Sequence, residues 1–277
     1  MKKGINIWSF PDNSLEYVFD LAKRAGFEGV ELSLDNEGEV ALNSTEKQLL
    51  EVRRLAKDSG IELYSLACGM CWGYWLNDDD PKMREKAKDI VKRQLEAASV
   101  LGCESTLVLP GVVNADFAVP GKIVDYETTY NRSLEAVNEL KVYAEQYKVE
   151  LGLENVWNKF LVSPIEMRDY IDKIGSRYVK CYFDVGNVLI NGYPEHWIRI
   201  LRNRINKVHI KDYRVAAGGL HGFVDLLAGD VNFPAVMDAL RSVGYDGWLT
   251  AEMSHYKYYK ETMIFNTSNA MDSILGR

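Results

Sequence analysis

The feature that most constrains the fold of this chain is a strict alternation of short strand-like runs with longer helix-like segments. Eight short runs are rich in β-branched and aromatic residues, a composition typical of β-strands. These runs are GINIW (4–8), GVELS (29–33), IELYSLA (61–67), STLVLP (105–110), VELGLE (149–154), YVKCYFD (178–184), INKVHI (205–210) and GWLTAE (247–252). Each is followed by a segment with the 3.6-residue apolar spacing of an amphipathic helix. The sequence therefore predicts eight β/α units.

The helix-like segments carry start and stop signals. Ser14 and Ser163 stand before two of them as N-cap residues, and Pro81 stands early in a third. Glycines such as Gly26 and Gly102 stand where left-handed C-caps are expected. Strict alternation implies parallel strands with right-handed crossovers, and eight units in about 250 residues is the size of a closed barrel. We predict an α/β fold: a single (β/α)8 TIM barrel that forms one domain over residues 1–277.

The competing arrangement is an open, doubly wound sheet. That fold favours a glycine-rich phosphate-binding turn after the first strand, with the pattern G-x-G-x-x-G. The first run here continues as SFPDNSL, which lacks that pattern. The closed barrel is therefore the preferred prediction.

Charge and hydropathy exclude several classes of partner. The formal net charge is −7 and the sequence pI is near 5.3, with no long run of Lys and Arg to match a polyphosphate backbone. No stretch approaches the roughly 18 consecutive apolar residues of a membrane-spanning helix. The N-terminal MKKGINIWSFPDNS has too short an apolar region for a secretory signal. We expect a cytoplasmic protein that binds neither nucleic acid nor membranes.

The last four strand-like runs each bring a metal-binding type of side chain to the C-terminal end of the predicted barrel. Glu154, Asp184 and Glu252 close their runs, and His209 lies near the end of INKVHI. Singly, such residues are more often helix caps, ion-pair partners or hydrogen-bonded core residues. Three converging carboxylates would repel one another, however, and a divalent cation removes that conflict. We predict a site for one metal ion, with a ligand set that suits Mn²⁺ best and Mg²⁺, Co²⁺ or Zn²⁺ as alternatives.

The spacing of two of these residues around the ring suggests a reaction. Glu154 and Glu252 lie on the fifth and eighth strand-like runs, so they should approach a bound ligand from different sides. Two carboxylates that flank one carbon suit removal of a proton next to a carbonyl and its return on the opposite face. We predict that the two glutamates form a catalytic acid–base pair acting through a metal-stabilised cis-enediolate.

The chain resembles the sugar phosphate isomerase/epimerase group of xylose isomerase-like TIM barrels, which includes ketose 3-epimerases and L-xylulose or L-ribulose 5-phosphate 3-epimerases. The resemblance spans essentially all of the sequence and is strongest in GLENVWNKF, FDVGN, KVHIKDY, GDVNF and GYDGWLTAE. It implies an isomerase acting on a small-molecule sugar or sugar phosphate, with 3-epimerisation favoured, and a homodimer or homotetramer. It also implies a metal held by Glu154, Asp184, His209 and Glu252, of which the two glutamates are catalytic.

Five further residues are predicted to contact the substrate. In many free-ketose epimerases of the group, the sixth strand is followed by a pattern that looks like D-x-G-H. This chain has DVGN there, and hence Asn187, which is more similar to the phosphosugar enzymes. Lys211 and Arg214 lie in the loop after the seventh run, where barrels often bind phosphate, although Arg214 is equally well a solvated loop residue. Trp8 and Trp157 are expected to form aromatic walls around a sugar, or alternatively to pack between helices and barrel.

Some alternatives stay open on the sequence alone. Asp212, in HIKDY, either orients His209 or caps the next turn. An inosose dehydratase or a hydroxypyruvate isomerase would use the same ligand set and an enediol-type intermediate. An endonuclease IV-like phosphodiesterase resembles the same fold but uses a multinuclear zinc site with many histidines. This acidic chain has only four, which disfavours that function.

Overall fold

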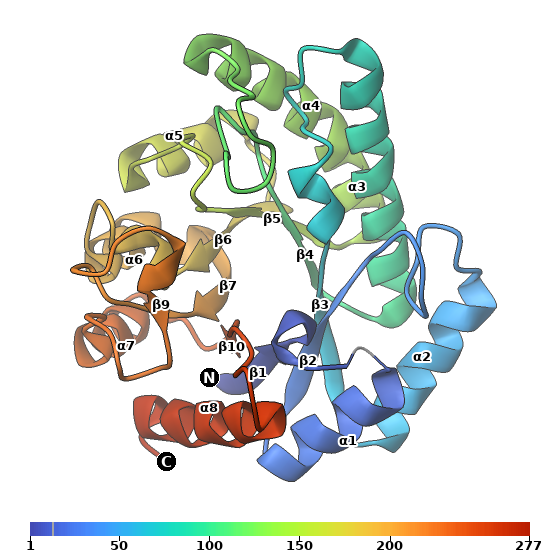
Figure 1. Cartoon of the computed structure of the whole chain (residues 1–277). Coiled ribbons are helices and arrows are strands. Elements are labelled where there is room, and N and C mark those ends of the chain that lie inside the picture. Colours follow the sequence, from blue (N-terminus) through green and yellow to red (C-terminus); the bar gives the residue numbers. More distant parts are fainter. Residues whose placement is uncertain (13) are drawn as a thin grey trace.

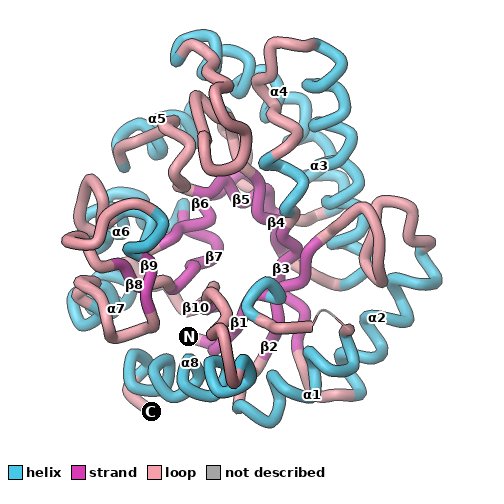
Figure 2. The backbone as a smooth tube through the Cα atoms, viewed as in Figure 1, coloured by secondary structure: helices cyan, strands magenta, loops and turns pink. Residues whose placement is uncertain are grey.

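The structure is a computed structural model that describes residues 1–12 and 14–277. Its centre is a closed barrel of parallel strands, seen along its axis in Figure 1 and as a ring of magenta segments in Figure 2. The barrel strands are β1 (Lys2–Asn6), β2 (Gly29–Ser33), β3 (Glu62–Ala67), β4 (Ser105–Val108), β5 (Glu150–Glu154), β6 (Val179–Asp184), β7 (Ile205–Ile210) and β10 (Trp248–Ala251). They follow one another around the ring in chain order. The predicted (β/α)8 fold is confirmed.

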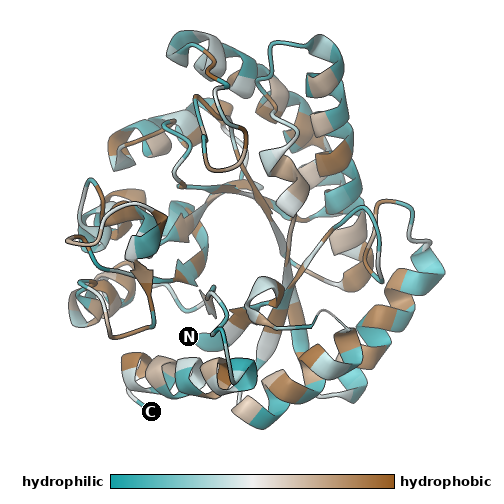
Figure 3. Ribbon diagram, in the orientation of Figure 1, coloured by the Kyte–Doolittle hydropathy of each residue, from teal (hydrophilic) through white to brown (hydrophobic). Residues whose placement is uncertain are grey.

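Helices cover the outside of the barrel. In the described residues they are α1 (Leu15–Ala25), α2 (Glu46–Asp58), α3 (Pro81–Leu101), α4 (Tyr126–Tyr147), α5 (Pro164–Ile174), α6 (Pro194–Leu201), α7 (Phe233–Ser242) and α8 (Lys260–Leu275). Figure 3 shows hydrophobic colours on much of the barrel and hydrophilic colours along the outer edges of many helices. Their apolar faces therefore pack against the barrel and form the main core with it.

Helix boundaries follow the signals in the sequence. Ser163 and Glu166 form a capping box at the start of α5, in which each backbone N–H donates to the other residue's side chain. Gly26 ends α1 with a φ of 85°, and Gly102 ends α3 with a φ of 82°. Both angles lie in the left-handed region that glycine adopts without a steric penalty. Ser14 is the N-cap residue of α1, but its side chain makes no capping hydrogen bond.

The two ends of the chain meet in the barrel. β1 pairs with β10 in parallel, so the first and last barrel strands close the ring. This closure supports one domain over residues 1–277, which stays a prediction. In the part of the chain that the structure describes, no helix combines the length and apolar character needed to span a membrane.

Aromatic side chains pack inside the barrel, away from the C-terminal ends of the strands. Tyr64 on β3 stacks on Trp248, the first residue of β10, with ring centroids 3.9 Å apart and an interplanar angle of 8°. The Tyr64 hydroxyl lies 2.8 Å from Thr250 Oγ1. Gly4 is required beside them, because a Cβ there would lie 2.2 Å from the Tyr64 hydroxyl. These contacts pack the barrel interior at this level, and the sites of such barrels are built at the other end, where the strands have their C-termini.

A small hairpin follows β7 and was not predicted. β8 (Asp212–Tyr213) pairs with β9 (Phe223–Val224) in antiparallel fashion. The Asp212 carboxylate accepts hydrogen bonds from the backbone N–H groups of Tyr213, Gly229 and Val231. Of the two roles open for Asp212, the structure therefore supports capping of the loop.

Candidate metal centre and active site

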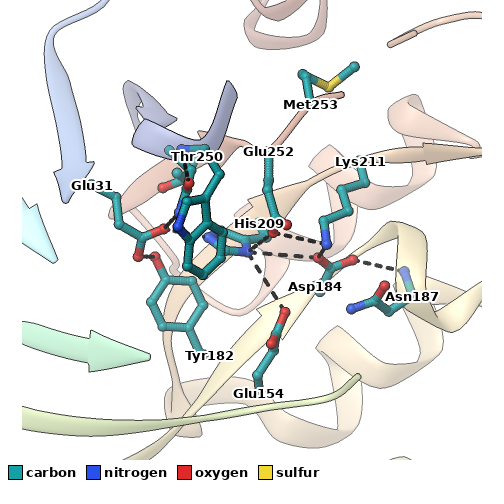
Figure 4. Close-up of polar contacts among 12 residues, drawn as sticks. Glu31, Glu154, Tyr182, Asp184, Asn187, His209, Lys211, Thr250, Glu252 and Met253 are labelled. Atoms are coloured by element: carbon teal, nitrogen blue, oxygen red, sulfur yellow. Dashed lines mark hydrogen bonds and ion pairs between the residues drawn. The ribbon is translucent and has the colours of Figure 1, made fainter. Parts of the chain in front are cut away.

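Four side chains meet at the C-terminal end of the barrel strands. Glu154 ends β5, Asp184 ends β6, His209 lies next to last in β7, and Glu252 directly follows β10. One ligand atom from each lies within 4.8 Å of the others. His209 Nδ1 is 2.9 Å from Glu252 Oε2 and 3.8 Å from both Glu154 Oε1 and Asp184 Oδ2 (Figure 4). The structure thus brings together all four residues that the sequence predicts as metal ligands.

The chemistry of this cluster fits a divalent cation. His209 Nδ1 and Asp184 Oδ2 are buried, and among the described residues each has a charged neighbour, Glu252 at 2.9 Å and Lys211 at 3.1 Å, but no hydrogen bond of good geometry. Buried polar atoms without a well-formed hydrogen bond are rare in native proteins, because burial removes their hydration. A cation between the four residues would satisfy both atoms. Three carboxylate oxygens and one imidazole nitrogen also form a donor set that Mn²⁺ and similar ions accept.

The two glutamates of the cluster differ in their affinity for protons. Burial raises the pKa of Glu154 to about 7, against the opposing effects of His209 and Lys211. Burial also acts to raise the pKa of Glu252, but Lys211 and His209 outweigh it and lower that pKa to about 2. Neighbouring carboxyl groups with separated pKa values are the arrangement that enzymes use to assign an acid and a base.

Lys211, predicted as a substrate contact, lies directly against the carboxylates. Its Nζ is 3.1 Å from Asp184 Oδ2 and 2.9 Å from Glu252 Oε2. Burial acts to lower the pKa of Lys211, but these carboxylates outweigh it and raise the pKa well above its ordinary value. Gly186 permits this placement, because a Cβ there would lie 2.6 Å from the Lys211 Cβ. The glycine of the FDVGN motif therefore makes room for the lysine.

A fourth acidic residue, Glu31, supports the cluster through His209 and was missed by the sequence analysis. It lies in the middle of β2 and is fully buried. Glu31 Oε2 is 2.7 Å from His209 Nε2, and the Tyr182 hydroxyl donates to Glu31 Oε1 (Figure 4). Asn6 Nδ2 donates a further hydrogen bond of 2.6 Å to Glu31 Oε2. A carboxylate on one ring nitrogen fixes the orientation of the imidazole and leaves the other nitrogen free for a metal. Glu31 therefore turns His209 Nδ1 toward the cluster.

We expect Glu31→Gln to weaken Mn²⁺ binding by about 10- to 100-fold, the usual effect of removing a group that orients a ligand histidine. The amide has the same shape but lacks the negative charge that holds the Nε2 proton. Titration calorimetry on the full chain measures the effect. Glu62→Gln, at an exposed carboxylate paired with Lys2, is the matched control. A folded Glu31→Gln variant with unchanged Mn²⁺ affinity would contradict this role.

Two asparagines hold the end of β6 in place. The Asn155 side chain donates to the Asp184 carbonyl oxygen and accepts from the Asp184 N–H, both at 2.8 Å. The Asn187 N–H donates to Asp184 Oδ1 at 2.8 Å, and its side chain donates to the Asn155 carbonyl oxygen at 3.1 Å. Asn187 also lines the cavity above the cluster, where its predicted role requires it. The sequence analysis did not identify Asn155.

A cavity of about 630 Å³ opens over the cluster. Glu252, Lys211 and Asn187 form part of its wall. The predicted aromatic residues Trp8 and Trp157 line it as well. The Trp157 indole N–H donates to the Asn187 carbonyl oxygen at 3.0 Å, which fixes the ring at the cavity wall. Both tryptophans are therefore placed where they can contact a ligand.

Arg214 is not brought to this cavity. Its side chain is exposed, and its guanidinium donates to the carbonyl oxygen of Ala228 in the same loop. It is absent from the residues that line the cavity among those the structure describes. The geometry therefore favours the alternative of a loop residue, because the exposed guanidinium is held by a contact within its own loop.

Residues 19–273 match the family described as Xylose isomerase-like TIM barrel. The chain belongs to this family, as its motifs indicated. SgbU of Haemophilus influenzae, provisionally named an L-ribulose-5-phosphate 3-epimerase, is 26% identical over 259 residues, which cover 91% of this chain and 88% of SgbU. The D-psicose 3-epimerase of Enterocloster bolteae is 26% identical over 237 residues, which cover 82% of this chain and 73% of that enzyme.

A solved structure shares the fold over the whole chain. The IolI protein, crystallised with a zinc atom, superposes with a TM-score of 0.81 at 18% identity, covering 100% of this chain and 98% of IolI. Both named relatives carry the names of epimerases, which are isomerases that act on carbohydrates. The predicted enzyme class is therefore confirmed.

Proposed function

We propose that this chain is a metal-dependent epimerase or isomerase of a ketose or ketose phosphate, with 3-epimerisation as its reaction. The observation that carries the proposal is the cluster of four ligand atoms within 4.8 Å, supplied by Glu154, Asp184, His209 and Glu252. The relatives named above support the substrate class, since one carries the name of a ketose epimerase and the other that of a ketose phosphate epimerase.

The protein's own groups divide the work of proton transfer. A divalent cation, when bound, supplies positive charge next to the substrate oxygens on which negative charge develops. Glu154 and Glu252 come from β5 and from the end of β10, so they reach a bound carbon from different directions. One accepts the proton beside the carbonyl and the other returns a proton on the opposite face. Lys211, 2.9 Å from Glu252, keeps that carboxylate ionised and oriented.

The cavity wall serves to hold the sugar and to exclude water. Trp8 and Trp157 present large apolar surfaces that displace water from the reacting atoms. Asn187 stands at the same wall next to Asp184, where an amide can bind a sugar hydroxyl. Lys211 is the cation of this wall that lies nearest to the proposed reaction, and it stays a predicted substrate contact.

Solvent exchange tests the reaction. We expect the Mn²⁺-loaded protein in D₂O to place deuterium at C3 of at least one member of a panel of ketoses and ketose 5-phosphates, with formation of the C3 epimer. NMR locates the label. Label at C1 or C2 would indicate an aldose–ketose isomerase instead, and loss of water a dehydratase. No exchange with any sugar after loading with Mn²⁺, Mg²⁺, Co²⁺ or Zn²⁺ would refute the proposal.

Several finer assignments belong to the same proposal. The sugar panel decides between a free and a phosphorylated substrate, because each ketose is paired with its phosphate. Metal analysis of the purified protein tests Mn²⁺ against the other ions. The homodimer or homotetramer, the cytoplasmic location and the absence of nucleic-acid and membrane partners stay predictions.

A further inference from the structure

We propose that an apolar cavity next to the catalytic cavity is a subsite for an aryl or alkyl substituent on the sugar substrate. The cavity has a volume of about 340 Å³ and is built from the loops that follow β4, β5 and β6. We call it the apolar recess; its apolar wall includes Ala115, Phe160, Leu161, Val162, Val188 and Ile190. This inference rests on the proposed function for the sugar part of the ligand and adds the chemistry of a second part.

The recess adjoins the catalytic cavity and shares a wall with it. Phe117, Val156, Trp157 and Asn187 line both. The Asn187 N–H donates to the Asp184 carboxylate at 2.8 Å, so the shared wall begins one hydrogen bond from the metal cluster. A sugar held at the cluster can therefore extend a substituent along Trp157 into the recess.

The polar groups around the recess are already engaged within the protein. Asn114 accepts a hydrogen bond from Lys159 Nζ at 2.8 Å and donates to Asp116 Oδ1 at 2.9 Å. Asn191 donates to the carbonyl oxygen of Val162 at 3.2 Å. Lys159 is the one cation among the described residues that line the recess, and Asp116 shares that rim. The recess therefore offers apolar surface and no concentrated positive charge, which suits an aryl or alkyl group and disfavours a phosphate.

The loop that forms the recess floor is held in an unusual conformation. Lys159 and Leu161 have φ values of 56° and 50°, in the left-handed region that side-chain-bearing residues rarely adopt. Asn158 is fully buried and fastens the loop by donating to the Gly111 carbonyl oxygen at 2.7 Å and accepting from the Phe160 N–H at 3.1 Å. Backbone strain of this kind persists where the surroundings enforce it, and it is concentrated at ligand sites.

Large apolar side chains remain exposed at the rim of the recess. Phe117 and Val162 are each 47% exposed, and Ile190 is 54% exposed. Apolar surface of this kind beside a cavity marks either a ligand groove or a protein interface. The wall shared with the catalytic cavity favours a ligand, and a second copy of the chain is the competing occupant that the experiment must separate.

Binding of D-fructose and of 6-O-benzyl-D-fructose to the full-length, Mn²⁺-loaded protein tests the subsite by calorimetry. We expect the benzyl ether to bind at least about tenfold more tightly, because the recess removes the phenyl ring from water. Ile190→Asp and Val162→Asp should each reduce this preference below about threefold while leaving D-fructose binding unchanged. Ile165→Asp, at a residue that is 45% exposed and outside the recess wall, is the matched control.

Each other outcome counts against the proposal in a distinct way. Equal affinities in the wild type, or a preference that survives both recess variants, would overturn the subsite. If sedimentation shows that Ile190→Asp dissociates a dimer and the benzyl ether has no advantage, the recess is an interface between copies. A benzyl preference without deuterium exchange on any ketose would refute the proposed reaction and leave the subsite standing.

Discussion

Glu154→Gln and Glu252→Gln should each slow epimerisation by about 10²- to 10⁴-fold, the typical contribution of one general acid or base. Glutamine keeps the shape of each side chain and an oxygen that can face a cation, but it cannot take up the substrate proton. Both residues lie in the cluster of ligand atoms within 4.8 Å, so substitution changes the chemistry of the site and not the barrel. Conversion of one sugar epimer into the other, followed by NMR, measures the effect.

Because the two glutamates are proposed to act on opposite faces of the substrate carbon, solvent exchange tests each of them separately. Each variant should still exchange the proton of the one epimer whose C–H bond faces the intact glutamate, without forming the other epimer. Asp225→Asn, at a cavity carboxylate that accepts a hydrogen bond from Tyr256, is the control and should keep most activity. Metal content must be measured beside activity. A variant with full metal content and normal epimerisation would remove that glutamate from the pair.

The fold could be predicted because its signals are local. The spacing of apolar residues and the local composition identify β2 and β7 with the same bounds as in the structure, residues 29–33 and 205–210. Local caps such as Ser163 with Glu166 fix helix ends within a few residues. The β8–β9 hairpin could not be found in this way, because each strand has two residues and depends on Asp212, whose carboxylate binds backbone far along the loop.

The site was predictable only where one rule of the barrel applies. The residues at the ends of parallel strands share one rim, so Glu154, Asp184 and Glu252 could be placed together from the sequence. Glu31 lies in the middle of β2 and meets His209 across the barrel, from a position 178 residues away in the chain. The polar Glu within GVELS was a visible signal, since a charge on a buried strand needs a partner. Its partner depends on side-chain direction, which the strand pattern does not give.

Arg214 shows the opposite limit. The phosphate-binding role expected of Arg214 rested on its position in the loop after β7. That rule says which loop binds phosphate but not where a given side chain in the loop points. In the structure the exposed Arg214 side chain donates to the Ala228 carbonyl oxygen, while Lys211, three residues earlier, reaches the cluster. Gly186 on the neighbouring loop makes room for Lys211, since a Cβ there would lie 2.6 Å from the Lys211 Cβ.

Lys211→Met should lower the free energy of unfolding by about 3 kcal/mol when a chelator keeps divalent ions away, because removing one partner leaves buried carboxylates uncompensated. The Lys211 ammonium is 3.1 Å from Asp184 Oδ2 and 2.9 Å from Glu252 Oε2. The carboxylates raise the pKa of Lys211, so its stabilising effect is fully present below the ordinary lysine pKa and hence at neutral pH. Chemical unfolding at pH 7 measures the loss.

Added Mn²⁺ should reduce that loss, because a cation held by the same carboxylates replaces the missing positive charge. Ligand binding to the folded state stabilises it in proportion to the logarithm of ligand concentration over Kd, so the two contributions can be separated by titration. The rise in Tm on adding Mn²⁺ should therefore be larger for Lys211→Met than for the wild type. Lys257→Met, at an exposed lysine beside Tyr258, should behave as the wild type. An equal loss with and without Mn²⁺ would mean that the lysine and the cation do not neutralise the same charges.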